Sequence, residues 1–207
     1  MTAMEFLESP LLAAVPGLVH GFGLRFPGPR EDARSAARVA FAGRGTVYFL
    51  RQVHGCEVAT PPWTEPPSAD GSSTEEPGSI LAIETADCLP VLIVDPVARR
   101  VAAAHAGWRG TAKGVARRAV ESLLAAGSRA GDLVVALGPS NGPCCYEVGP
   151  DVEEAFGADG ARFFVPGRSV RKHLDVAAAN RAQLLDAGVR ADRIDVLSLC
   201  TQCRPDL

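Results

Sequence analysis

The strongest constraint on the fold is a series of apolar segments that are each too short to be a helix. They are separated by clusters of Gly, Pro, Asp and Ser. Short apolar runs bounded by such turn residues are typical of buried strands. We therefore predict strands at residues 46–53, 80–84, 90–95, 101–105, 133–137 and 194–199.

Only two segments, 113–126 and 175–187, place apolar residues at helical spacing, and Gly188 is predicted to end the second helix. Strands thus outnumber helices, and not every strand is followed by a helix, which favours the α+β class. Residues 60–79 are rich in Pro, Ser, Glu and Gly and are predicted to form a long surface loop. We expect one domain over residues 1–207.

Composition argues against several classes of partner. The formal net charge is −3, without the basic excess that nucleic-acid-binding proteins carry. The apolar runs are too short to span a membrane. Glu5 and Glu8 stand where a signal peptide would carry basic residues. We expect a cytoplasmic protein with reduced thiols and with neither a membrane nor a nucleic acid as partner; the oligomeric state stays open.

Two of the four histidines, His54 and His105, and one cysteine, Cys88, lie where a predicted strand gives way to a loop. Two imidazoles and a thiolate suit Zn²⁺, with Cu²⁺ as a substitute. Three protein ligands leave a fourth position for water or substrate, as in catalytic zinc sites. Because no close pair of ligands joins the three, their spacing also allows three unrelated core and surface residues.

The segment that follows His105, AGWRGT (106–111), leads into the first predicted helix. Thr111 is a candidate N-cap, and a helix N-terminus attracts anions. Arg109 is a candidate to hold a phosphate or carboxylate, the alternative being a surface arginine stacked on Trp108.

The remaining cysteines give weaker signals. Cys144 and Cys145 are adjacent and are interpreted as packed thiols, with their Gly/Pro-rich loop able to line a pocket. Cys200 and Cys203 form a CxxC pair, but a single pair without a second one is weak evidence for a metal. We therefore expect no metal at Cys200 and Cys203.

Several longer segments together resemble the YfiH-type family, also called the polyphenol oxidase or laccase-domain family, the purine nucleoside phosphorylase family and peptidoglycan editing factor. They cover most of the chain from about residue 20 onward and occur in the family's order. The family continues past this point into a segment like FFSYRR, so we expect this chain, which stops at RPDL, to lack that C-terminal segment. The matching segments are RQVHG (51–55), SADG (68–71), ETADCLPVLIVDP (84–96), VAAAHAGWRGTAKG (101–114), LGPSNGPCCYEVG (137–149), LDVAAANRAQLLDAGV (174–189) and LCTQC (199–203).

The resemblance implies an αββα-type sandwich, with two mixed sheet layers flanked by helices. It implies that His54, Cys88 and His105 are ligands of a zinc ion. It also implies phosphorolysis of adenosine, inosine, guanosine and methylthioadenosine, with adenosine deamination as a second activity. The expected partners are therefore a purine nucleoside and phosphate.

We predict two sets of functional residues on this basis. The catalytic set is His54, Asp87, Cys88, His105 and Arg109, with Asp87 or Glu147 as the acid/base for deamination. The set that binds substrate or phosphate is Arg51, Gln52, Arg109, Thr111, Cys145 and Glu147.

Three alternative functions remain open at this level. Cys88 and His105 could form the dyad of a cysteine hydrolase that edits peptidoglycan precursors. Copper at the same ligands could give a laccase-like polyphenol oxidase, although four histidines are too few for a multicopper site. Without its C-terminal segment, the chain could be a metal-binding scaffold without catalytic activity.

Overall fold

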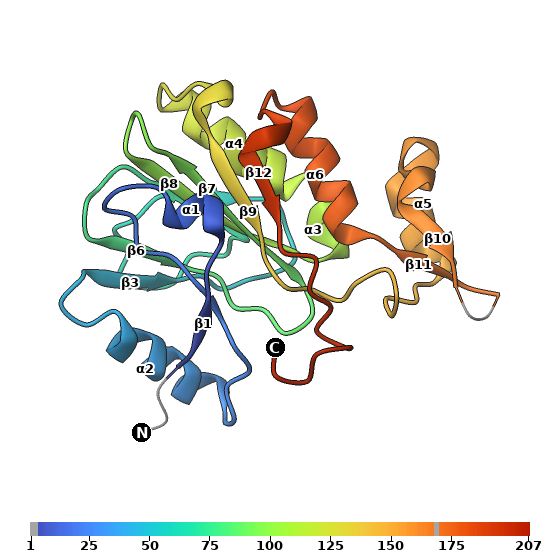
Figure 1. Cartoon of the computed structure of the whole chain (residues 1–207), viewed down its shortest axis with the longest axis horizontal. Coiled ribbons are helices and arrows are strands. Elements are labelled where there is room, and N and C mark those ends of the chain that lie inside the picture. The colour runs from blue at the N-terminus through green and yellow to red at the C-terminus, as the bar shows by residue number, and fades with distance from the viewer. Residues whose placement is uncertain (1–3, 168–169) are drawn as a thin grey trace.

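The computed structural model describes residues 4–167 and 170–207. Its centre is a six-stranded mixed sheet with the strand order β12-β9-β7-β8-β5-β4 (Figure 1). The two longest strands, β7 and β8, pair antiparallel in the middle of the sheet, whereas β9–β12 and β4–β5 are parallel pairs. The strands are β4 (Val58–Ala59), β5 (Gly71–Thr74), β7 (Leu89–Asp95), β8 (Arg100–Ala106), β9 (Val134–Leu137) and β12 (Ile194–Val196).

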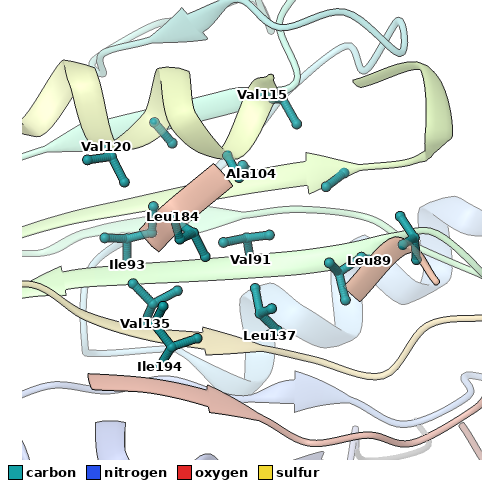
Figure 2. Packing of buried hydrophobic residues seen from close by; sticks show 14 of the residues in the cluster. Leu89, Val91, Ile93, Ala104, Val115, Val120, Val135, Leu137, Leu184 and Ile194 are labelled. Atoms are coloured by element: carbon teal, nitrogen blue, oxygen red, sulfur yellow. The ribbon is translucent and has the colours of Figure 1, made fainter. Parts of the chain in front are cut away.

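Two helices, α4 (Val115–Ala125) and α6 (Val176–Asp186), cover one face of this sheet and lie side by side (Figure 1). Figure 2 shows the core beneath them, where alternate residues of β7 pack with residues of α4, α6, β9 and β12. Leu89, Val91 and Ile93 are completely buried there. Burial of each such side chain stabilises the fold by roughly 1.5–3 kcal/mol, which makes this end of the sheet a rigid support.

The intervening residues of the same strands face the other side and build a second, smaller core. Val94, Val134 and Ala136 pack there against Leu12 of α1 (Pro10–Ala13). The period of two along β7 and β9 thus buries both faces of the sheet.

A second sheet layer consists of the parallel pair β3 (Thr46–Phe49) and β6 (Ser79–Ala82). β6 contacts β5 and β8 of the central sheet, and β3 contacts α2 (Arg30–Ala40). The predicted α+β class, with two sheet layers and helices on the outside, is confirmed.

The other elements are short or lie at the periphery. α5 and the pair β10–β11 project to one side of the sheet (Figure 1). They and the remaining elements are β1 (Phe6–Leu7), β2 (Phe22–Gly23), α3 (Trp108–Ala112), α5 (Pro150–Gly160), β10 (Phe164–Pro166), β11 (Lys172–Leu174) and the 3-10 turns η1 (Ala130–Asp132), η2 (Ala161–Phe163) and η3 (Ala191–Arg193).

Most predicted elements are present, with changes at their ends. The predicted strand 46–53 ends at Phe49, and the second helix ends just before Gly188, which has a φ of +91°. The prediction of a surface loop over 60–79 is wrong for β5, because residues 71–74 form a buried strand between β4 and β8. Within residues 4–167 and 170–207, no helix has the length and hydrophobicity needed to cross a membrane.

Helix α2 is mostly polar and buries little of its own surface, so it depends on an ion-pair clamp. The carboxylate of Glu84, just after β6, accepts two hydrogen bonds each from Arg30 and Arg34, at 2.5–3.0 Å. Burial opposes ionisation of Glu84, but the two guanidinium groups outweigh it and lower the pKa of the carboxyl from 4.5 to about 2. This clamp attaches α2 to the second sheet layer.

We predict that Glu84→Gln lowers the free energy of unfolding at pH 7 by about 1–2 kcal/mol, since Arg30 is largely exposed and its share is screened. The folded-state pKa lies below the unfolded one, so this stabilisation is present above pH 4.5 and is lost as pH falls toward 2. Urea unfolding at pH 7 and pH 3 should therefore show a smaller difference between wild type and variant at pH 3. Glu31→Gln, which removes an exposed partner 3.8 Å from Arg34, is the control and should cost about 0.5 kcal/mol or less. An undiminished difference at pH 3 would contradict the clamp.

Candidate metal centre

The central sheet brings two of the predicted ligands together through its register. His105 near the end of β8 pairs with Pro90 on β7, and Cys88 directly precedes β7. His54, which follows β3, completes the group: the donor atoms of His54, Cys88 and His105 all lie within 4.8 Å of one another. His105 is only 3% exposed, Cys88 is half-buried and His54 is exposed. The group therefore opens toward solvent on the side of His54.

Asp70, which precedes β5, holds two of these residues in place although it is completely buried. One carboxylate oxygen contacts His105 Nδ1 at 2.8 Å and accepts the backbone N–H of His54 at 3.0 Å. The other accepts the backbone N–H groups of Val53 and Gly55 at 3.0 and 2.7 Å. The segment 53–55 wraps around this charge, which accounts for the left-handed backbone of His54 (φ +58°).

The pKa shifts of Asp70 and His105 indicate which ring nitrogen of His105 carries the hydrogen. Burial disfavours the charged form of Asp70, but the hydrogen bonds from His105 and from residues 53–55 outweigh it and lower the pKa of the carboxyl. Burial also lowers the pKa of His105, against the opposing effect of Asp70. A neutral imidazole beside a carboxylate carries its hydrogen on Nδ1, so Nε2 is left as a metal donor.

The surroundings of Cys88 fit a bound cation. Burial raises the pKa of its thiol, and the negative charges of Asp87 and Asp70 raise it further. A thiolate at this position therefore needs a positive partner. The backbone of Gly107 approaches so closely that a Cβ there would lie 2.7 Å from Cys88 Sγ. With two imidazoles and one sulfur, the group has the donor set and the open side of a three-ligand zinc site.

Several polar groups interact electrostatically with Cys88 or lie close to it in sequence. The side chain of Arg109 is exposed and stacks on Trp108 with 4.2 Å between the guanidinium carbon and the ring centroid. Burial raises the pKa of Tyr146 to about 12, with further upward effects from Cys88 and Asp87 and a downward one from Arg109. Tyr146 is therefore a protonated phenol within electrostatic reach of the centre at neutral pH.

Other predicted binding residues are engaged in holding the structure. The side-chain amide of Gln52 makes two hydrogen bonds with the backbone of Glu84, and Arg51 donates to Ser68 Oγ at 2.8 Å. The N-cap prediction for Thr111 is wrong, because Thr111 lies inside α3, whose N-cap is Gly107. Its hydroxyl is completely buried and accepts from Asn180, so its position gives no support to a phosphate-binding role.

The remaining predicted residues lie in the loop after β9. Glu147 is exposed and pairs with Arg171 at 3.5 Å. Cys145 lies in a second group of sulfur atoms together with Cys144, Cys200 and Cys203. Burial raises the pKa of Cys200, but the backbone N–H groups of Gly142 and Cys203 outweigh it and lower this pKa to about 7.

Two functional candidates had no signal in the sequence. Asp70 stands in the segment SADG, which matched the family without suggesting a role, and only the pairing of β5 with β8 brings it to His105. Tyr146 was not distinguished from its neighbours by any periodicity.

Two surface hollows lie away from the metal group. One of about 310 Å³ lies beside β10 and β11, and one of about 620 Å³ lies beside β3 and Trp63. Neither is lined by His54, Cys88 or His105. The candidate substrate position is the open side of the metal group, because three protein ligands leave a fourth position of a zinc ion free.

Comparison with known proteins shows that this chain has relatives of known name and a matching family model. The family model described as "Multi-copper polyphenol oxidoreductase laccase" matches residues 30–207. A protein named "Purine nucleoside phosphorylase" from Deinococcus radiodurans is 44% identical over 167 residues, which are 78% of this chain and 65% of the relative. A protein named "Adenosine deaminase RL5", from an unknown prokaryotic organism, is 39% identical over 140 residues, which are 65% of this chain and 53% of the relative.

The fold is shared with a solved structure as well. The crystal structure of YlmD from Geobacillus stearothermophilus superposes with a TM-score of 0.81 at 30% identity, covering 99% of this chain and 88% of that one. The chain thus spans between about half and two thirds of the length of the two named relatives. Because the family model covers most of its length, the chain belongs to the multi-copper polyphenol oxidoreductase laccase family.

Proposed function

We propose that this chain is a zinc-dependent purine nucleoside phosphorylase with adenosine deamination as a second activity. The observation that carries the proposal is the group of His54, Cys88 and His105, with donor atoms within 4.8 Å of one another and one side open. Relatives at 39–44% identity are named for these two reactions. The reaction class thus comes from the names of the relatives, and a donor set suited to zinc supports it.

A zinc ion, when bound, supplies a Lewis acid at the open position. In phosphorolysis a phosphate oxygen bonds to C1′ of the ribose as the bond from C1′ to N9 of the purine breaks. Arg109, exposed and held against Trp108, presents guanidinium donors for the phosphate. Stacking fixes the plane of the guanidinium, which lowers the entropy lost when phosphate binds.

The departing purine must gain a proton, and we assign Tyr146 as its donor. Tyr146 is protonated at neutral pH, and it interacts electrostatically with Cys88, Asp87 and Arg109. Asp87 is the acid/base that we assign to deamination. Its carboxylate accepts from Thr201 Oγ1 at 2.7 Å, which fixes its orientation.

The alternative functions have less support. A cysteine hydrolase needs a thiolate at Cys88, whereas burial and two neighbouring carboxylates raise the pKa of that thiol. A multicopper oxidase needs many imidazole ligands, whereas in the part of the chain that the structure describes only one group of metal-binding side chains contains histidine.

The decisive experiment is product analysis with adenosine, in the presence and absence of phosphate. We expect phosphate-dependent release of adenine and ribose 1-phosphate by the zinc-loaded protein. Cys88→Ala should abolish this turnover and the zinc bound by His54, Cys88 and His105, while leaving the melting temperature close to that of the wild type without zinc at these three residues. Absence of turnover with every purine nucleoside by the zinc-loaded protein would refute the proposed function.

We predict that Asp70→Asn weakens zinc binding by about 10–100-fold, because His105 loses the acceptor that fixes its tautomer. Competition with a chelating dye measures the affinity. Asp95→Asn is a matched control: Asp95 is also buried and accepts two backbone N–H groups, but it lies at the opposite end of β7 from Cys88. The control should lose stability without losing zinc affinity, and equal affinity in both variants would contradict the role of Asp70.

We predict that Tyr146→Phe lowers kcat for phosphorolysis by about 100-fold with unchanged zinc content, because only the proton donor is removed. The ring packs against the main core, and phenylalanine keeps this packing. Nucleosides with a more acidic leaving base need less protonation, so the defect should shrink with such substrates. A uniform loss for all leaving groups would instead indicate a structural role.

A further inference from the structure

A second group of metal-binding side chains lies outside the centre described above. The sulfur atoms of Cys144, Cys145, Cys200 and Cys203 all lie within 4.8 Å of one another. The first two belong to the loop after β9, and the last two to the segment after β12. All four are free thiols. The two pairs are far apart in sequence and meet because β9 and β12 are parallel neighbours.

The distances between the sulfur atoms fit coordination of one metal ion and are too long for a disulfide. Cys203 Sγ lies 3.6 Å from Cys144 Sγ and 3.5 Å from Cys145 Sγ. Four thiolates at about 2.3 Å from a tetrahedral zinc ion lie roughly 3.8 Å from one another. A disulfide would bring two sulfurs to about 2.05 Å. An iron–sulfur cluster distributes its thiolates over at least two iron atoms, so some of its sulfur pairs would lie farther apart than the four found here.

Each pair sits on a tight turn that presents its sulfurs to the other pair. The N–H groups of Cys145 and Tyr146 both donate to Gly142 O at 2.9 Å, and those of Cys203 and Arg204 donate to Cys200 O at 3.1 and 3.0 Å. Across the gap, the Gly142 N–H donates to Cys200 Sγ at 3.3 Å. Backbone donors of this kind orient and stabilise the thiolates of metal sites.

Hydrophobic packing does not explain the cluster. Cys144 and Cys203 are exposed, so their sulfurs gain little from burial. Exposed thiols in contact are prone to oxidation unless a metal or a disulfide occupies them. The expectation that Cys200 and Cys203 bind no metal rested on the lack of a second pair, and the fold supplies that pair.

We propose that Cys144, Cys145, Cys200 and Cys203 bind a second zinc ion in a closed, four-thiolate structural site. Four protein ligands leave no position for a substrate, which is the pattern of structural zinc. The ion fastens the loop after β9 to the segment after β12. Both segments also contact Asp87, through the Asn141 N–H to Asp87 O (2.8 Å) and the Thr201 hydroxyl to Asp87 Oδ1 (2.7 Å).

The test is the zinc content of the full chain, purified under reducing conditions and measured by inductively coupled plasma mass spectrometry. We expect two equivalents in the wild type and one in the double variant Cys200→Ser/Cys203→Ser. His54→Ala should also lose one equivalent, from the other site. Cys56→Ser, which changes a half-buried cysteine outside both groups, is the matched control and should keep two.

Cobalt makes the ligand set visible even if the double variant does not fold. His54→Ala loaded with one equivalent of Co²⁺ keeps all four cysteines, so it should show the visible absorption of tetrahedral cobalt with thiolate-to-cobalt charge transfer from four sulfurs. A wild type with one zinc, lost entirely in Cys88→Ala, would overturn the proposal. So would a double variant that retains two zinc ions, or a disulfide between the two pairs in the reduced protein.

Discussion

The structure around the metal centre depends on one buried negative charge, the carboxylate of Asp70. It is completely shielded from solvent, and such a charge persists only when hydrogen bonds replace its hydration. Three successive backbone N–H groups, from Val53 to Gly55, and the ring of His105 provide these bonds. One group therefore joins three segments: the start of β5, the end of β8 and the loop that carries His54.

The three candidate ligands of this centre are held with different rigidity. His105 lies in β8 and Cys88 directly precedes β7, and the register and buried core of these two central strands leave both residues little freedom. His54 belongs to a loop in a left-handed conformation that the hydrogen bonds to Asp70 compensate. Because the exposed His54 comes from a loop, the centre is open to solvent on its side. This arrangement combines a rigid base with access for a substrate.

The sequence predicts the parts of this fold whose signals are local. β7 and β8 were predicted within two residues because continuous apolar runs are typical of strands that are buried on both faces. β5 was missed because its residues, Gly71–Thr74, include no large apolar side chain, and its burial comes only from its neighbours β4 and β8. α2 was missed because its apolar residues are mostly alanines among many charged side chains, and because its attachment depends on Glu84.

The same distinction applies to the candidate site. His54, Cys88 and His105 were selected by their places at strand ends, but their convergence followed from the family resemblance and not from spacing. Asp70 and the four-cysteine group depend on pairings between segments distant in sequence, which no local pattern contains. The tight turns at Gly142 and Cys200 are local, whereas their meeting depends on the parallel alignment of β9 with β12.

The two groups of ligands are connected through Asp87. Its negative charge raises the pKa of the adjacent Cys88, and its backbone and side chain are held by Asn141 and Thr201. These two residues lie beside the cysteines of the second group, so an ion that fastens the cysteines also fixes the position of Asp87. The effect of a charge on the pKa of a neighbouring thiol falls with distance. The position of Asp87 therefore determines how far its charge raises the pKa of Cys88, and so how much this thiol needs a nearby cation to ionise. The four-cysteine group therefore bears on the chemistry of the open centre without contributing a ligand to it.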